Sequence, residues 1–422
     1  MEKNKIVIFA ITVWVIVALG YLNQNQRPQR CMDFWGHVEY TSIIANDMIF
    51  PSPSHGWETF QPPLYYLINS YIAPNTFKTD NTIHIRYVEY LSVFYGAVVL
   101  WIIYWFLGKF CIDPKIQLIV LLFIATTPKF AFVFSSYNND SLAILLSIAT
   151  LAFTYKLYYD WSVRYATLLL LVATAAHYTK YIALISTAAA FLICFKDLVL
   201  KKSLGQNQKK VLVILMASVI LLVPWLKFHN YKYSGEYFPS NIKGIGDQDG
   251  LRLPKDKFLL DIVSPTAILE MREHKWEDPF HHVWSTEVST KKSDYWSSSF
   301  INSIYGETSF KEPGLLVAWL LFWIHLFSRV SGLKIMLKSG VNKIAGILIL
   351  VAHLGQIAII FTAPYAPSMD YRLIGWTWLP WAILYANFLT QKTPWSELLK
   401  RVLIVAICVQ SYTLFTIGEE FR

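Results

Sequence analysis

The sequence predicts an all-α integral membrane protein, a bundle of about eleven transmembrane helices. Three observations lead to this prediction. Of the 422 residues, 55% are hydrophobic and only 15% are charged, whereas a soluble domain carries about 25% charged residues. Several apolar runs reach the roughly 20 residues with which a helix crosses the hydrocarbon core. Aromatic residues make up 16% of the chain, and many lie at the ends of these runs, where their rings favour the headgroup layer.

The apolar runs place the predicted spans along the chain. The first run follows Lys3 and Lys5, and no small-residue cleavage site comes after it, so we expect a retained anchor span rather than a signal peptide. The two runs between residues 165 and 195 are short for membrane crossings. In chain order, the predicted spans are 6–22, 86–107, 115–134, 140–158, 165–177, 180–195, 210–228, 313–329, 342–362, 371–389 and 398–416.

The distribution of lysine and arginine predicts the orientation. With the N-terminus in the cytoplasm, the inner segments hold most of these residues, Arg329 among them, whereas the short outer turns hold only Lys180. This asymmetry predicts a multi-pass protein of the plasma (inner) membrane. The lipid bilayer is then one of its binding partners. The net charge of +9 is accounted for in this way, and no basic stripe with stacking aromatics indicates nucleic acid.

Two long segments then lie outside the membrane, and we expect interfacial helices in them. Residues 23–85 form the first extracytoplasmic loop, within an N-terminal transmembrane module, 1–228. Residues 229–312 form a large loop that is too long for an ordinary connection. Residues 313–422 form a C-terminal transmembrane module. The four cysteines have no paired spacing, so we expect no disulfide framework.

The first outer loop contains an acid close to the end of the first span. Asp33 and His37 are four residues apart, and in a helix they share a face with Tyr40. Such an acid could meet a substrate at the membrane surface, and the alternative is a solvated loop carboxylate. Glu58 and Gln61 follow, just before paired prolines, which favour the start of a helix. The Tyr-rich run beyond them predicts a helix lying in the interface, either a loop anchor or the wall of a lipid-entry groove.

Further charged residues lie at the outer ends of later spans. Asp140 is placed to cap the following helix, and it also faces the same surface as Asp33. Lys129 must either snorkel or contact an anion. Lys180, after His177, opposes the charge rule and so indicates an anionic partner such as a phosphate.

The last outer turn contains Tyr371 and Arg372. The guanidinium fork of Arg372 suits a phosphate, and a surface pair with Asp370 is the alternative. The acids and cations of these loops share one side of the bilayer at one depth. We therefore expect Asp33, Asp140, Lys180 and Arg372 to converge in one polar cavity.

The order of these motifs resembles the GT-C class of membrane glycosyltransferases, and is similar to polyprenyl-phosphate-dependent protein mannosyltransferases and aminoarabinose transferases. The resemblance covers about residues 30 to 390. Its motifs are Asp33 with His37 and Tyr40, the segment Gln61-Pro62-Pro63-Leu64-Tyr65-Tyr66, Asn138-Asn139-Asp140, the cations Lys180 and Arg372, and the segments Tyr295-Trp296 to Phe300 and Tyr305-Gly306.

The resemblance implies an inverting transfer of one sugar from a polyprenyl-phosphate donor to an extracytoplasmic acceptor, which can be a lipid, a glycan or a protein. Inversion needs a carboxylate that deprotonates the acceptor, and we assign Asp33 to this role. Lys180 and Arg372 would stabilise the departing phosphate. Asp140 would be a second acid that orients the acceptor or holds a metal.

Several points stay open at this stage. The sequence predicts no cofactor with certainty, and a divalent metal is left open: His37, Glu39 and Glu58 could serve as ligands, but their spacing matches no strong motif. Two other functions also compete with a transferase. A transporter or flippase of lipid-linked sugars would carry charges deep within its spans, whereas a glycan polymerase or ligase would use a larger donor.

Overall fold

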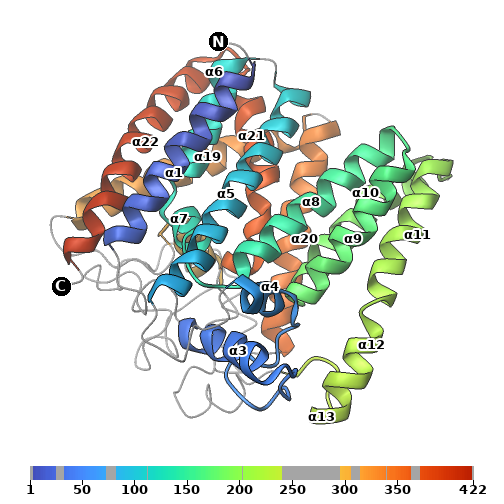
Figure 1. Ribbon diagram of the computed structural model, residues 1–422. Helices are drawn as coiled ribbons and strands as arrows, with labels where there is room; N and C mark the ends of the chain where they lie inside the picture. The colour runs from blue at the N-terminus through green and yellow to red at the C-terminus, as the bar shows by residue number, and fades with distance from the viewer. Residues whose placement is uncertain are drawn as a thin grey trace.

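The computed structural model describes residues 3–24, 33–72, 82–111, 113–201, 203–239, 295–305, 314–338, 340–362 and 371–420 (Figure 1). Within these ranges the regular structure is entirely helical. The large loop 229–312 lies mostly outside the described residues, and Asp370 lies wholly outside them, so the predictions made for them stay predictions.

The long helices form a bundle. Their bounds are α1 Lys3–Gln24, α5 Thr82–Phe110, α6 Pro114–Ala125, α7 Pro128–Phe134, α8 Asp140–Tyr159, α9 Val163–Thr179, α10 Ala183–Lys201, α11 Gln206–Ile220, α19 Gly314–Met336, α20 Gly340–Thr362, α21 Trp378–Leu389 and α22 Pro394–Glu420. Shorter elements are α3 Phe34–Asp47, α4 Leu64–Ile72, α12 Val223–Trp225, the π-helix Leu226–Tyr231, α13 Lys232–Ser234, α18 Tyr295–Tyr305 and the 3-10 helix η4 Tyr371–Thr377.

The bundle belongs in a membrane. Five described helical stretches are long and apolar enough to cross one, and six if a bent pair is counted as one span. Every predicted span coincides with a helical segment. However, α9 has 17 residues and α21 has 12, fewer than the roughly 20 of a straight crossing. The count of about eleven spans therefore stays a prediction.

One predicted span is not a continuous helix. We expected residues 115–134 to form a single helix, but α6 and α7 meet at a 65° bend. The break lies at Thr126 and Thr127, just before Pro128 at the start of α7. Proline has no backbone N–H and disfavours helical geometry in the residue before it. As a result, α7 runs in a different direction from α6, and all seven of its residues are buried.

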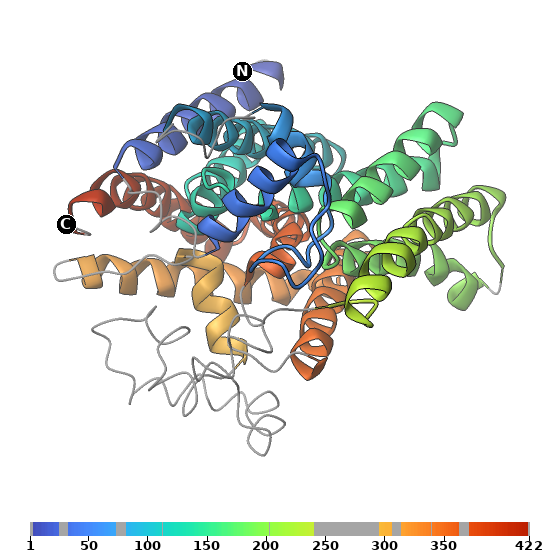
Figure 2. The ribbon, with the colours of Figure 1, turned by 60° about the horizontal axis from the view of Figure 1, so that its bottom comes forward.

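The helices α3 and α4 lie across one end of the bundle, which we call the site end (Figure 1). Figure 2 brings this end toward the viewer, and α3 crosses the ends of the longer helices there. As predicted, α4 begins directly after the paired prolines at positions 62 and 63. Its residues Tyr65 and Tyr66 are buried, so α4 covers the bundle rather than standing apart from it.

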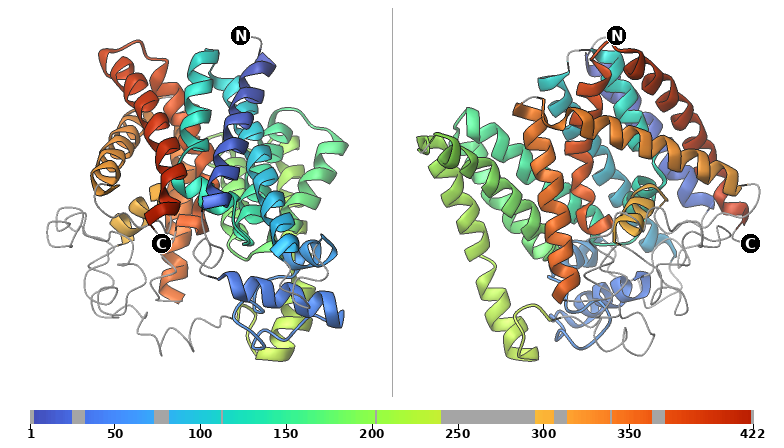
Figure 3. Two further views of the ribbon diagram at one scale, coloured as in Figure 1. Left: turned by 60° about the vertical axis from the view of Figure 1, so that its left-hand side comes forward. Right: turned by 180° about the vertical axis from the view of Figure 1, so that it is seen from behind.

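Three helices, α1, α5 and α7, approach one another closely. On α5, Gly96 faces the Trp14 ring of α1 and Phe134 of α7, and an added Cβ atom would come within 2.8 Å of that ring. The Trp14 Nε1–H donates to the Val93 carbonyl oxygen at 3.0 Å. Its ring also meets Phe130 edge-to-face at 4.8 Å. In both views of Figure 3, α1 runs beside α22, with which it packs.

We expect Gly96→Ala to destabilise the fold, because the new methyl group would overlap the Trp14 ring and separate α1 from α5. Overpacking of this kind costs about 1–3 kcal/mol. The matched control is Gly108→Ala on the same helix, where nothing lies within 4 Å of an added Cβ. Thermal unfolding of the detergent-solubilised protein measures both. Equal transition temperatures for the two variants would contradict the close approach.

Candidate functional site

Two acids and two cations converge at the site end, and we call them the acid–cation cluster: Asp33, Asp140, Lys180 and Arg372. Arg372 Nη2 lies 3.0 Å from Asp33 Oδ2, and its Nε lies 3.8 Å from Asp140 Oδ2. Lys180 Nζ lies 2.6 Å from Asp140 Oδ1. The cluster is thus a chain of ion pairs, Asp33–Arg372–Asp140–Lys180.

Four separate segments supply these side chains. Asp33 precedes the first turn of α3, Asp140 opens α8, Lys180 follows the last turn of α9, and Arg372 lies in η4. The cap role considered for Asp140 is wrong, because its carboxylate pairs with Lys180 and makes no cap hydrogen bond. The backbone N–H of Ser141 instead donates to Asn138 Oδ1 at 3.0 Å.

Asp33 is the member of the cluster that solvent reaches best. Its side chain is 15% exposed, whereas that of Asp140 is 2% exposed. The Trp57 Nε1–H donates to Asp33 Oδ1 at 2.8 Å, a contact that the sequence motifs did not reveal. Burial raises the pKa of Asp33, but Arg372, His37 and the Trp57 hydrogen bond outweigh it, so the net shift is downward. The carboxylate is therefore ionised and oriented.

A second group of polar side chains, the α3–α4 polar group, lies beside the cluster: His37, Glu58, Tyr66 and Asn139. The Tyr66 hydroxyl lies 3.0 Å from His37 Nδ1 and donates to Glu58 Oε2 at 3.5 Å. The Asn139 amide donates to the same hydroxyl at 3.3 Å, and its carbonyl oxygen accepts from Lys180 at 3.1 Å. The Tyr66 hydroxyl thus contacts His37, Glu58 and Asn139, a central position that the sequence motifs did not indicate.

Burial sets the protonation of this group. Burial, with Asp33 close by, raises the pKa of Glu58 well above its usual value. Burial also lowers the pKa of His37 to about 3, so the imidazole is neutral. His37 Nε2 is buried and has no hydrogen-bond partner in the part of the chain that the structure describes. It is therefore free to bind a polar group of a substrate.

Two packing features hold the group in place. Gly36 allows the loop at Trp57 and Glu58 to touch α3, since a Cβ atom there would come within 2.9 Å of both side chains. The Tyr40 ring stacks on Tyr66 at 3.9 Å. Its hydroxyl donates to the Gln61 backbone oxygen at 3.3 Å. Tyr40 and Gln61 therefore contribute here by holding the loop against α3.

Asp33, His37 and Glu58 are also the group in the described chain that could hold a metal, with ligand atoms within 4.8 Å of one another. As arranged, these ligands are occupied. Both Asp33 oxygens are engaged by Trp57 and Arg372. Glu58 would also first have to lose its proton. An ion could bind only by displacing these contacts.

Three predicted site residues are not members of the acid–cation cluster. His177 does not join the cluster: its Nε2 lies 2.9 Å from Thr187 Oγ1, and its Nδ1 lies 3.3 Å from the Ser218 carbonyl oxygen. It therefore joins α9 to α10 and α11, because a buried imidazole needs partners. Lys129 is buried, and its ammonium lies 5.0 Å from the Phe132 ring centre.

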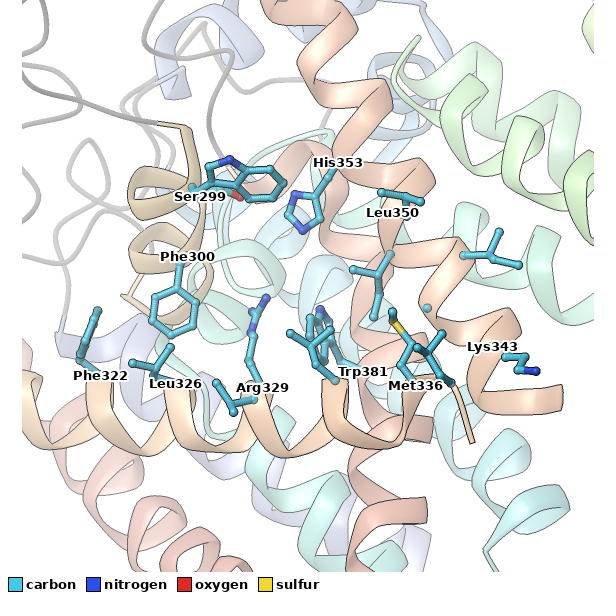
Figure 4. A pocket seen from close by; sticks show the side chains of 17 residues that line it. Ser299, Phe300, Phe322, Leu326, Arg329, Met336, Lys343, Leu350, His353 and Trp381 are labelled. Carbon is cyan, nitrogen blue, oxygen red and sulfur yellow. The ribbon is translucent and has the colours of Figure 1, made fainter. Parts of the chain in front are cut away.

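The third residue, Tyr371, contacts Arg329, which lines a different feature, the α19–α20 groove. This cavity of about 660 Å³ is lined by side chains of α18, α19, α20 and α21. Figure 4 shows Phe300, Arg329, Trp381 and His353 around it, with Lys343 at the far side. Arg329, which the charge distribution assigned to an inner, cytoplasmic segment, lies within α19 with its guanidinium 5.5 Å from the Tyr371 ring.

The protonation of Glu58 predicts a pH effect on stability. An acid whose pKa is raised on folding binds its proton more tightly in the native state, so stability falls as pH rises. Between about pH 5 and pH 8, the wild type should therefore lose stability relative to Glu58→Gln, which keeps the shape of a neutral acid. Thermal unfolding over this range measures the difference. A constant difference between the two proteins at all pH values would contradict a buried neutral Glu58.

Several solved structures are similar in fold to this chain. The oligosaccharyltransferase of Archaeoglobus fulgidus tethered to an acceptor peptide matches with a TM-score of 0.52 and 11% identity, over 98% of this chain and 55% of that one. The complex of AglB from Archaeoglobus fulgidus with an inhibitory peptide and a dolichol-phosphate matches with a TM-score of 0.50 and 12% identity, over 98% and 56%. ArnT from Cupriavidus metallidurans matches with a TM-score of 0.42 and 12% identity, over 92% and 78%.

No protein-family model and no curated protein matches the sequence. The chain spans about half the length of the oligosaccharyltransferase. The resemblance to the GT-C class, drawn from the motifs, is confirmed at the level of the fold: the chain is a membrane protein with the fold of the GT-C glycosyltransferases.

Proposed function

We propose that the protein is an inverting glycosyltransferase that moves a sugar from a polyprenyl-phosphate donor to an acceptor outside the cytoplasm. One observation carries this proposal: two acids and two cations from four distant segments meet within ion-pair distance at one end of an apolar bundle. Burying such groups together is costly. A reaction that needs a base and charge stabilisation at one place accounts for that cost.

The chemistry assigns a role to each member of the acid–cation cluster. Asp33 accepts the proton of the acceptor hydroxyl as the acceptor oxygen bonds to the anomeric carbon. The bond from that carbon to the phosphate oxygen breaks on the opposite face, and its electron pair leaves with the phosphate. Arg372 and Lys180 stabilise the charge on the leaving phosphate. Asp140 holds both cations at this position and is the second acid.

The α3–α4 polar group then contacts the sugar or the acceptor. His37 offers its unpaired Nε2, and neutral Glu58 offers a carboxyl proton. Tyr40 and Gln61 shape the wall behind them. Tyr371 connects the cluster with the α19–α20 groove, which would hold the polyprenyl chain. Lys129 stays a candidate ligand, whereas the contacts of His177 give no support for a substrate role.

The topology predicted from lysine and arginine belongs to this proposal. It places the N-terminus in the cytoplasm of a cell with a plasma (inner) membrane, and the site end on the extracytoplasmic side. About eleven spans would divide into modules 1–228 and 313–422, with 229–312 as the outer loop between them. The gathering of Asp33, Asp140, Lys180 and Arg372 at one end of the bundle favours a transferase over a flippase.

Asp33→Asn should abolish sugar transfer and leave donor binding nearly unchanged, because it removes a proton acceptor and almost no volume. General-base catalysis contributes about 10²–10⁴-fold to a rate. The assay follows release of polyprenyl phosphate from a panel of polyprenyl-phosphate-linked sugars in nanodiscs, with candidate lipid, glycan and peptide acceptors. A larger lipid-linked glycan in the panel tests the polymerase or ligase alternative.

The matched control is Asp160→Asn, which also breaks an acid–lysine pair, with Lys156 at the opposite end of α8. It should keep the wild-type rate. Wild-type turnover by Asp33→Asn would overturn the assignment of the base. If the wild type instead moved the intact lipid-linked sugar across the bilayer, the flippase alternative would replace the transferase.

Because the described acids do not form a ready metal site, we expect transfer to continue in the presence of a chelator. The wild-type protein would be treated with EDTA and assayed before and after Mg²⁺, Mn²⁺ or Zn²⁺ is added back. Loss of activity on chelation and its return with one ion would contradict this expectation. It would mean that Asp33 exchanges Arg372 for a metal when substrate is bound.

A further inference from the structure

The π-helix Leu226–Tyr231 contacts two segments of the site end through its buried residues His229 and Asn230. We propose that His229 is a pH-dependent clamp: it holds the loop between α3 and α4, residues 48–63, while its imidazole carries two protons, and releases the loop when one proton is lost. The clamp consists of His229, Asn230 and the Pro51 carbonyl group. In Figure 1, α12 and α13, which flank the π-helix, lie beside α3 at the site end.

The first argument is that both ring nitrogens of His229 face oxygen atoms that can only accept hydrogen bonds. Nε2 lies 3.0 Å from the Pro51 carbonyl oxygen, and Nδ1 lies 3.1 Å from Asn230 Oδ1. The Asn230 amide is oriented by its other atom, because Nδ2 donates to the Tyr237 carbonyl oxygen at 2.8 Å. A flipped amide would set two oxygens against each other there. A neutral imidazole has one N–H and serves only one acceptor, so the geometry fits the imidazolium form.

The second argument is the surface on which the ring lies. The Trp225 ring stacks on His229 with centroids 3.9 Å apart and an interplanar angle of 14°. The face of an aromatic ring stabilises a cation. His229 is only 8% exposed, and a buried polar ring needs partners for both of its nitrogens. The stacked indole and the two oxygens together supply what a buried imidazolium requires.

Few other titratable or charged groups surround the clamp. Tyr233 of α13 has its ring centre 5.6 Å from that of His229, and the Tyr181 hydroxyl is connected to the ring only through Asn230. Lys227 and Lys232 belong to the same helical stretch but are exposed, so solvent and salt screen their charges. Among the residues that the structure describes, no carboxylate forms an ion pair with His229. The two oxygens are therefore the acceptors that hold its protons.

The loop between α3 and α4 carries the contact at Pro51 toward the acid–cation cluster. The Thr59 hydroxyl donates to the Pro53 carbonyl oxygen at 3.1 Å and accepts from the backbone N–H of Gly56 at 2.9 Å. These bonds close the loop into a compact unit. Trp57, which donates to Asp33 Oδ1, belongs to the same unit. A loop released at Pro51 would therefore loosen the support of the proposed base.

The other contact of the clamp lies beside Lys180. Asn230 Nδ2 donates to the Tyr181 hydroxyl, and Trp225 Nε1 donates to the same oxygen at 3.2 Å. Tyr181 directly follows Lys180 in the chain. The clamp thus joins the loop that supports Asp33 to the turn that holds Lys180. His229 is a positioning residue, and only its effect on sugar transfer rests on the proposed function.

The sign of the pH dependence follows from the contacts. Histidine side chains change charge between about pH 5 and pH 8. The held loop favours the imidazolium form, so holding is strongest at low pH and is lost as pH rises. At high pH, one ring nitrogen would present a lone pair to an oxygen, and that contact would open.

The test is amide hydrogen exchange of the full chain in nanodiscs, followed by mass spectrometry without any substrate. Protection of the loop between α3 and α4 is compared from about pH 5 to pH 8, after correction for the intrinsic exchange rate at each pH. His229→Phe keeps a ring against Trp225 but has no N–H, and His229→Gln keeps one donor that does not titrate. His55→Gln is the matched control, because it removes an exposed histidine of the same loop that lies outside the clamp.

We expect wild-type protection of the loop to fall about tenfold as pH rises, the effect of losing one charge-assisted hydrogen bond. His229→Phe should show low protection at every pH. His229→Gln should be intermediate and independent of pH, and His55→Gln should follow the wild type. Exchange in α6, at the opposite end of the bundle (Figure 1), should be equal in all four proteins, which shows that the variants fold.

Three results would overturn the inference. Constant wild-type protection across the pH range would mean that the clamp does not titrate. The same fall in His229→Phe would assign the pH dependence to another group. A loss in His55→Gln as large as that in His229→Phe would mean that the loop opens without reference to the π-helix. Because no sugar donor is present, the clamp can fail while the proposed function stands, and the reverse holds equally.

Discussion

The pairing of Arg372 with two acids is the interaction on which the site depends. One guanidinium joins Asp33, from the loop after α1, to Asp140, at the start of α8, and Lys180 closes the chain of charges. Removing one partner of a buried pair costs about 3–5 kcal/mol. Without Arg372, Asp33 would lose its cation and the buried Asp140 would keep only Lys180, so these ion pairs hold η4 against α3 and α8.

The same ion pairs also affect the chemistry of Asp33, the proposed base. Arg372 and Trp57 hold Asp33 ionised and engage both of its carboxylate oxygens. A donor phosphate that attracts Arg372 would release one carboxylate oxygen and restore its basicity. The same cation would then serve the leaving group. Under the proposed function, the ion pairs are therefore the resting arrangement of the catalytic groups.

The groove and the cluster meet at one point of the chain. Tyr371 touches Arg329, and the adjacent Arg372 touches both acids. These two residues begin the 3-10 helix η4, and neighbouring side chains of a helix point in different directions, so the two side chains reach different surroundings. The bend before Pro128 has a comparable effect on α7.

The sequence by itself determined the membrane class, the helical segments and the position of the acids and cations at the ends of these segments, because hydropathy, proline and charge act locally along the chain. The same local rules account for α3, which follows Asp33, and for the start of α4 after the paired prolines. The tertiary structure decided what no local pattern contains. It brought Trp57 to Asp33 and Tyr66 to Glu58, and it gave His177 structural partners. It also placed Arg329 in a groove rather than in a loop, because contacts between distant segments depend on how whole helices pack.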